Sequence, residues 1–140
     1  MIDAAPPACG LAAAKAAIVQ THLKMQTIGD SPTRIAPSSA DEVVCAGETM
    51  AVSIASGGTA GDIDFVLFRR TATGWRVALT RGGYKLGLFR AAADVVESQP
   101  VYRKNDPNCC PTGGFDHVRF HWNGFRFVAA RTWHTKSFEP

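Results

Sequence analysis

Long apolar runs and catalytic signature motifs are both absent from this 140-residue sequence. No stretch approaches the roughly 18 to 20 apolar residues that a membrane-spanning helix needs, so no transmembrane segment is expected. A serine hydrolase would show a G-x-S-x-G elbow, which does not occur, and the glycine-rich SGGTAGD lacks the Lys-Ser/Thr ending of a phosphate-binding loop. The motifs therefore name no catalytic residue, and an enzyme is not the favoured interpretation.

Concentrated charge is missing as well. Lys and Arg number 15 against 12 Asp and Glu, for a net charge of +3, and the basic residues are scattered in pairs such as Arg69 and Arg70. Proteins that bind nucleic acid usually gather basic residues into a patch or stripe. No nucleic-acid partner is therefore expected.

The length and the lack of internal repeats predict one domain. A chain of this size buries roughly two-thirds of the surface that its unfolded form exposes, so one core suffices. We expect a disordered leader over residues 1–8, a globular domain over residues 9–135 and a tail over residues 136–140.

The residues that are present predict an α+β fold. Residues 11–25, LAAAKAAIVQTHLKM, combine strong helix formers with no Gly or Pro, and one stripe of the resulting helix carries Leu11, Ile18, His22 and Met25. After about residue 42, short segments with alternating apolar residues predict strands. The expected architecture is one N-terminal helix packed on a curved antiparallel sheet of about six or seven strands.

The clearest strand pair is HVRFHW and FRFVAA, joined by Asn123 and Gly124. Asn-Gly favours a two-residue type I′ turn, which would place Trp122 opposite Phe125 and Phe120 opposite Phe127. The other face of this hairpin would then be polar and open to water. It would carry Arg119, His121 and Arg126, joined by Arg76 from the segment WRVALT. Such a basic face is a candidate surface for an anionic polymer, acidic lipid headgroups or a partner protein.

Histidines and carboxylates offer few catalytic or metal-binding arrangements. His117 and His121 are spaced H-x-x-x-H, but in a strand four residues separate them by about 13 Å, too far for one metal ion. His134 has no evident partner in the C-terminal segment. No metal and no cofactor are therefore expected. A cleft lined by Asp62, Asp64 or His117 is the basis of the alternative interpretation, an exported hydrolase-like enzyme.

Four cysteines, Cys9, Cys45, Cys109 and Cys110, indicate two disulfides formed in an oxidising compartment. We therefore expect an exported protein, in the periplasm, in the cell envelope or secreted, whose signal peptide has been removed. Adjacent cysteines suit neither a zinc ribbon nor a C-x-x-C redox motif.

The pairing of the cysteines stays open on the residues alone. Neighbouring Cα atoms lie ~3.80 Å apart, below the usual range for bridged cysteines, so a bond between Cys109 and Cys110 would be unusual. This favours bonds from these two residues to the other two cysteines. A bond between Cys9 and Cys45, however, would restrain the loop over residues 29–41 and would stabilise the fold by about 3 to 4 kcal/mol.

Several segments resemble one bacterial family. Cys9 before a helix, Cys45 at a strand, VLF followed by GYKLG, and YRKNDPNCCPTGG followed by VRFHWNG are similar to the LppP/LprE lipoprotein family of actinobacteria and its relatives in other bacteria. The resemblance runs from about Cys9 to Val128, and its specific part is CCP-x-GG with R-F-x-W-x-G. It implies an envelope protein, secreted or lipid-anchored, without an established enzymatic activity. It also implies bonds between Cys9 and Cys45 and between Cys109 and Cys110.

These patterns together predict an exported bacterial domain that acts as a non-enzymatic binding or interaction module, stabilised by disulfides. The surfaces expected to bind are the exposed face of the last hairpin and the loop NDPNCCPTGG, in which Asn108, Pro111 and Gly113 are the candidate residues. An envelope glycan, a lipid headgroup and a protein are the candidate partners.

Overall fold

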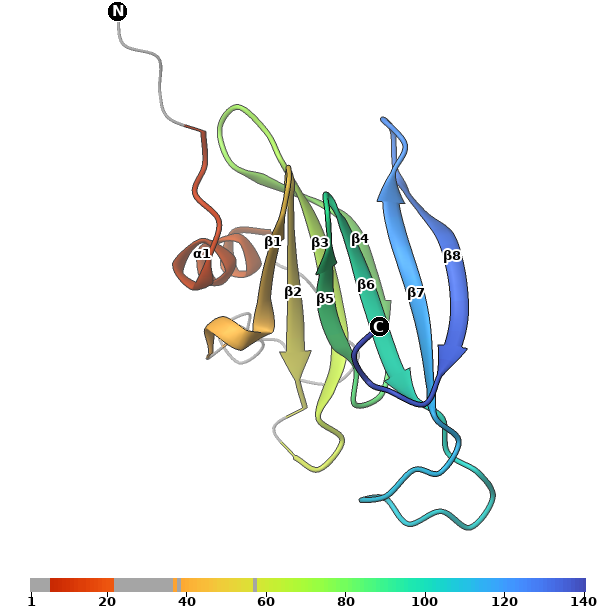
Figure 1. Ribbon diagram of the computed structural model, residues 1–140. Coiled ribbons are helices and arrows are strands. Elements are labelled where there is room, and N and C mark those ends of the chain that lie inside the picture. Colours follow the sequence, from red (N-terminus) through yellow and green to blue (C-terminus); the bar gives the residue numbers. More distant parts are fainter. Residues whose placement is uncertain (1–5, 22–36, 38, 57) are drawn as a thin grey trace, which may run out of the picture.

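Eight strands in two antiparallel sheets and one α-helix make up the described part of the chain, which is residues 6–21, 37, 39–56 and 58–140 of a computed structural model (Figure 1). Helix α1 spans Leu11–Thr21, and a short 3-10 turn, η1, spans Ala40–Glu42. Sheet A consists, in this order, of β1 (Val43–Ala46), β2 (Thr49–Ala55), β3 (Asp62–Arg70) and β4 (Trp75–Gly82). Sheet B consists, in this order, of β5 (Gly87–Ala91), β6 (Asp94–Pro100), β7 (Phe115–Trp122) and β8 (Phe127–Thr135).

The α+β class is confirmed, but the strands form two sheets of four and not one curved sheet of six or seven. The change of sheet occurs after Gly82. There the backbone N–H groups of Gly83 and Leu86 still donate to carbonyl groups of β3, so the chain follows β3 beyond the end of β4. Lys85 then adopts a positive φ of 48°, and β5 leaves sheet A instead of forming a hairpin with β4.

Helix α1 covers the outer face of sheet A through small side chains. Ala14 and Ala17 are buried, and at this spacing they share one helix face with Ile18. The cluster that joins the helix to sheet A consists of Ala14, Ala17, Ile18, Met50, Val52, Ile54, Val66 and Phe68. The helix predicted over residues 11–25 is confirmed as far as Thr21; residues 22–25, including His22, lie outside the described residues.

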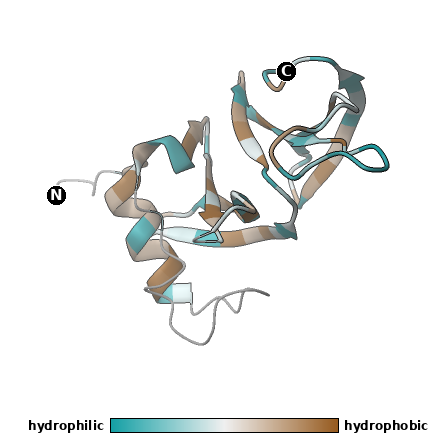
Figure 2. Cartoon of the chain, turned by 90° about the horizontal axis from the view of Figure 1, so that it is seen from below, coloured by the Kyte–Doolittle hydropathy of each residue, from teal (hydrophilic) through white to brown (hydrophobic). Residues whose placement is uncertain are grey.

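A second cluster fills the space between the two sheets. It consists of Ala46, Ala51, Phe65, Leu67, Leu86, Val95, Phe120 and Phe127. Figure 2 shows α1 and sheet B on opposite sides of sheet A, so β2 and β3 are covered on both faces. One face of β2 carries the large apolar side chains of Met50, Val52 and Ile54, which pack against α1. The other face of β2 carries small residues such as Ala51 and Ser53. A pattern of alternating large apolar side chains does not identify such small residues as part of the core.

The last hairpin has a longer turn than predicted. Trp122 lies opposite Phe127, not Phe125, so residues 123–126 form a four-residue loop. Asn123 keeps a negative φ, whereas a type I′ turn needs positive φ at both central residues. Its side-chain oxygen instead accepts from the backbone N–H groups of Phe125 and Arg126. The predicted register was therefore wrong by two residues, a shift that preserves which side chains share a face.

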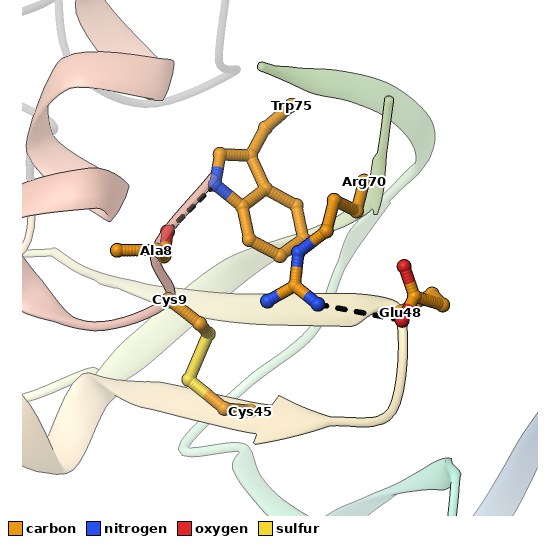
Figure 3. The surroundings of a disulfide bond; sticks show 6 residues. All are labelled: Ala8, Cys9, Cys45, Glu48, Arg70 and Trp75. Carbon is orange, nitrogen blue, oxygen red and sulfur yellow. Dashed lines mark hydrogen bonds and ion pairs between the residues drawn. A yellow bond between two sulfur atoms is a disulfide. The ribbon is translucent and has the colours of Figure 1, made fainter. Parts of the chain in front are cut away.

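The N-terminal end of α1 is fixed to sheet A by a disulfide and an aromatic contact (Figure 3). Cys9 is bonded to Cys45 of β1, with their Cα atoms 6.1 Å apart. The indole N–H of Trp75 donates to the carbonyl of Ala8 at 2.9 Å, and the guanidinium of Arg70 lies 4.9 Å from the Trp75 ring. The helix and the first strand therefore remain together across the long connection between them.

Candidate functional site

Residues 101–114 connect β6 to β7 and form what we call the cysteine loop. One carboxylate organises it. Asp106 accepts hydrogen bonds from the backbone N–H of Arg103 (2.7 Å), from the backbone N–H of Thr112 (2.8 Å) and from the Thr112 hydroxyl (2.8 Å). These hydrogen bonds lower the pKa of Asp106, because they favour its charged form. The bond from the backbone N–H of Arg103 has the largest effect. The loop is therefore folded around a carboxylate that is ionised at neutral pH.

A second set of contacts fastens the cysteine loop to the β4–β5 connection. The hydroxyl of Tyr102 donates to the carbonyl of Asn108 at 2.6 Å, and Lys85 Nζ donates to the same carbonyl. The hydroxyl of Tyr84 donates to the side-chain oxygen of Asn108. The two tyrosine rings meet edge to face with centroids 5.7 Å apart. Asn108, predicted as a candidate binding residue, is thus occupied in holding the loop.

The end of the loop packs so closely that only glycine fits. A Cβ atom on Gly113 would lie 2.4 Å from the carbonyl oxygen of Val101, and one on Gly114 would lie 2.6 Å from that of Thr135. Gly114 also has a φ of +76°, which a side chain disfavours. The loop is therefore pressed against the end of β8.

The two remaining cysteines are joined to each other at the exposed side of this loop. Cys109 and Cys110 form a disulfide between sequence neighbours with Cα atoms 3.7 Å apart, and both residues are exposed. With the bond between Cys9 and Cys45, this is the pairing that the family resemblance implies and not the crossed pairing that the Cα spacing favours.

A pocket of about 510 Å³ opens between the cysteine loop and the end of β8. Its basic side chains are Arg103 from the loop and His134 and Lys136 from the C-terminal segment. Its other lining residues are Pro111, Thr112, Gly113, Gly114, Phe115 and Thr135. Two segments distant in sequence therefore bring cationic groups and an aromatic ring to one cavity.

His134 is paired with an acid at the edge of this pocket. Its Nδ1 atom lies 2.7 Å from Asp116 Oδ1, and the two residues face each other across the β7–β8 ladder. Both also line a neighbouring pocket of about 390 Å³. The expectation that His134 has no partner was therefore wrong, because the partner is supplied by strand pairing.

His117 is buried close to the same place. Its Nδ1 lies 2.6 Å from the Ser98 hydroxyl, its Nε2 lies 2.6 Å from the Thr135 hydroxyl, and its ring packs on Trp133. Burial lowers the pKa of His117, with smaller opposing contributions that include Asp116. His117 is fully buried, whereas His121 on the same strand is exposed. The C-terminal segment accounts for the difference, because Phe138 packs against Phe89 and Phe115 on this face of sheet B.

The predicted basic face is present only in part. Arg119 and His121 lie side by side on β7, but both bind Asp94, at 2.8 and 2.9 Å. Although burial would raise it, the pKa of Asp94 is lowered overall by hydrogen bonds from Arg119 and His121. Arg126 lies in the hairpin loop, and Arg76 lies on β4 of sheet A. These four residues do not form one uncompensated patch, and their role in binding stays a prediction.

The carboxylates expected in a cleft with His117 lie elsewhere. Asp62 and Asp64 are on β3 of sheet A, and Asp64 is buried. Burial raises the pKa of Asp62, against a hydrogen bond with Ser53. His117 lies on the face of sheet B that points away from sheet A, since its neighbours Val118 and Phe120 contribute to the cluster between the sheets. The structure therefore does not bring Asp62 or Asp64 together with His117.

Arg103 and Lys136 line this pocket with a guanidinium and an ammonium group, and the sequence patterns singled out neither residue. Each stands in a short polar segment, YRKNDP or HTKS, with no motif to mark it. Their proximity depends on the pairing of β7 with β8, which carries residues 134–136 to the cysteine loop. The paired glycines of CPTGG were the available signal, because they indicate close backbone approach.

Comparison with protein-family models, with curated proteins and with solved structures found no match to this chain. The resemblance to the LppP/LprE family stays a prediction. None of the described helices is long and apolar enough to cross a membrane. Within the same residues, no three or more His, Cys, Asp or Glu side chains are grouped so that they could hold a metal ion.

Proposed function

We propose that this protein is an exported binding module that recognises an acidic saccharide in the pocket between the cysteine loop and the end of β8. The observation that carries this proposal is the convergence of Arg103, His134 and Lys136 on one cavity of about 510 Å³. A guanidinium and an ammonium group are suited to the carboxylate or phosphate of such a ligand.

The walls of the pocket suit a sugar ring. Phe115 and Pro111 present apolar surface beside the cations. Ligand sites in proteins are typically mostly apolar, with a few polar groups that fix orientation. The hydroxyl of Thr112 and the backbone around Gly113 are already held by internal hydrogen bonds, so the pocket wall is preformed. A preformed wall reduces the ordering cost of binding.

Export is supported by the disulfides. Every cysteine of the described chain is oxidised, and such bonds persist mainly outside the reducing cytosol. The resemblance to an envelope lipoprotein family points to the same compartment. An acidic envelope glycan is therefore a ligand that this protein would meet.

Calorimetric titration with tetragalacturonate, and with the neutral tetragalactoside as reference, tests this proposal. The double variant Arg103→Gln/Lys136→Gln removes two charges from the pocket, and Arg76→Gln/Arg126→Gln removes two charges elsewhere as a matched control. We expect the pocket variant to bind the acidic sugar at least tenfold more weakly and the control to bind within twofold of the wild type. An equal loss in both variants would show unspecific attraction, and failure of the wild type to bind would contradict the proposed ligand class.

A second candidate function, hydrolysis by an exported enzyme, is favoured by the pair of His134 and Asp116. A carboxylate hydrogen-bonded to an imidazole at 2.7 Å is an arrangement that orients a general base. A panel of nitrophenyl esters and glycosides should then show pH-dependent turnover that His134→Gln abolishes. Turnover no faster than that of the variant would rule out this function.

A further inference from the structure

The disulfide between Cys109 and Cys110 constrains almost none of the chain. A disulfide stabilises a fold mainly by restricting the unfolded chain, and this effect grows with the length of the closed loop. The bond between Cys9 and Cys45 spans a sequence separation of 36, whereas that between Cys109 and Cys110 spans a separation of 1. Stabilisation of the fold therefore does not explain the second bond.

Nor does the cysteine loop need this bond to keep its shape. Before the cysteines, Asn108 is held by Tyr84, Lys85 and Tyr102. After them, Thr112 is bound to Asp106. The backbone N–H of Gly113 donates to the carbonyl of Val101 at 2.9 Å, and Cys110 itself donates to the carbonyl of Pro107 at 3.0 Å. All of these contacts remain possible when both cysteines are thiols.

The bond is also accessible to a reductant. Cys109 and Cys110 are both exposed and do not belong to either hydrophobic cluster. Lys85 approaches the backbone directly before the pair, where its Nζ binds the carbonyl of Asn108. Exposed disulfides are typically those that take part in exchange, whereas structural disulfides resist reduction.

From these observations we infer that Cys109 and Cys110 form a redox-active pair that exchanges with an external dithiol. One thiolate of the dithiol attacks a sulfur of the pair, the bond between Cys109 and Cys110 breaks, and a mixed disulfide forms. The second thiol of the dithiol then displaces the cysteine from that mixed disulfide. Two electrons and two protons pass from the dithiol, which becomes a disulfide, to Cys109 and Cys110, which become thiols. This inference does not depend on the proposed saccharide ligand.

Adjacency of the two cysteines selects a dithiol as the reaction partner. After the first attack, the freed cysteine is one residue away from the mixed disulfide and expels a monothiol by re-forming the original bond. A dithiol resolves the mixed disulfide within the same molecule before that reversal. We therefore expect dithiothreitol to reduce the pair at least tenfold faster than glutathione at equal thiol concentration.

The test is timed reduction of the folded protein, quenched with iodoacetamide and read by peptide mass. We expect Cys109 and Cys110 to be alkylated at least tenfold earlier than Cys9 and Cys45, with the aromatic bands of the near-ultraviolet spectrum retained, and oxidised dithiothreitol to restore the bond in unquenched protein. The variant Cys109→Ser/Cys110→Ser should take up no label under the same conditions. Simultaneous or earlier reduction of Cys9 and Cys45, loss of the folded spectrum on reduction, or equal rates with glutathione would each overturn the inference.

Discussion

The buried imidazole of His117 links the stability of this protein to pH. It sits between the hydroxyls of Ser98 and Thr135 and against the ring of Trp133. Burial lowers its pKa from the ordinary value of 6.5, whereas Asp116 raises it and His134 lowers it further. The unfolded chain therefore binds a proton at His117 more readily than the folded chain, and stability falls as the pH drops below about 6.5.

Replacing His117 should remove this part of the pH dependence. We expect His117→Gln to be less stable than the wild type at pH 8 but to lose less stability between pH 7 and pH 5, because glutamine does not titrate. Urea unfolding at four pH values measures this difference. His121→Gln, on the same strand but exposed, is the control, and a wild-type slope in His117→Gln would refute the assignment.

The fit of Gly113 against Val101 gives a second prediction at this scale. A Cβ atom 2.4 Å from a backbone carbonyl oxygen forces the chain to move, so Gly113→Ala should lower the free energy of unfolding by about 1 to 3 kcal/mol. Gly74→Ala is a matched control, because no atom lies within 4 Å of its Cβ position. Its effect should stay within about 1 kcal/mol. Equal effects of the two substitutions in thermal unfolding would contradict the close packing of the cysteine loop.

At the scale of elements, the β7–β8 hairpin separates two phenylalanines that the predicted register had placed together in the core. Phe125 is 88% exposed in the four-residue loop, whereas Phe127 is 8% exposed. Phe125→Ala should therefore change stability by less than about 0.5 kcal/mol. Phe127→Ala should cost about 3 kcal/mol or more. Chemical denaturation measures both, and a large loss with Phe125→Ala would instead support the two-residue turn.

The two disulfides should differ sharply in their effect on stability. Removing the bond that joins the start of α1 to β1, in Cys9→Ser/Cys45→Ser, should cost about 3 to 4 kcal/mol by loop entropy. Cys109→Ser/Cys110→Ser should lower the free energy of unfolding by less than about 1 kcal/mol, because a bond between neighbouring residues closes no loop of intervening residues. Guanidinium unfolding of the two double variants makes the comparison. Similar losses would mean that the second bond stabilises the cysteine loop.

Elements whose pattern is local could be predicted from the sequence, and their placement could not. The sequence predicts a helix over LAAAKAAIVQT and an inward-facing position for Phe120 and Trp122. Both predictions depend only on the spacing of residues within one segment. The split into two sheets depends on how the chain leaves β3 after Gly82, which involves hydrogen bonds to residues about 20 positions away. The pocket could not be predicted from the sequence for the same reason, since Arg103 and Lys136 come together only when β7 and β8 are paired.

For the whole molecule, strand direction separates the pocket from the basic residues of the hairpin. The pocket adjoins Phe115 and Thr135, where β7 begins and β8 ends, whereas Arg126 lies in the loop at their other end (Figure 1). A ligand in the pocket therefore does not reach the hairpin loop unless it is a long polymer. The two basic regions can be tested independently in one protein.

Salt should weaken binding of an acidic saccharide in proportion to the charges involved. The range of electrostatic attraction shrinks from about 8 Å at physiological salt to about 3 Å at 1 M. We expect the affinity for tetragalacturonate to fall several-fold between 50 mM and 500 mM salt in the wild type and to change little in Arg103→Gln/Lys136→Gln. Calorimetric titration at both salt concentrations measures this. A salt-independent wild-type affinity would contradict recognition by these cations.

The proposed binding function depends most on where the ligand lies. Amide chemical shifts recorded while tetragalacturonate is added to uniformly labelled protein would locate it directly. Binding in the pocket should cause saturable changes at Arg103, Phe115 and Lys136 and at the neighbouring residues of the cysteine loop. Changes confined to Arg119, His121 and Arg126, or no saturable change in any residue, would contradict it.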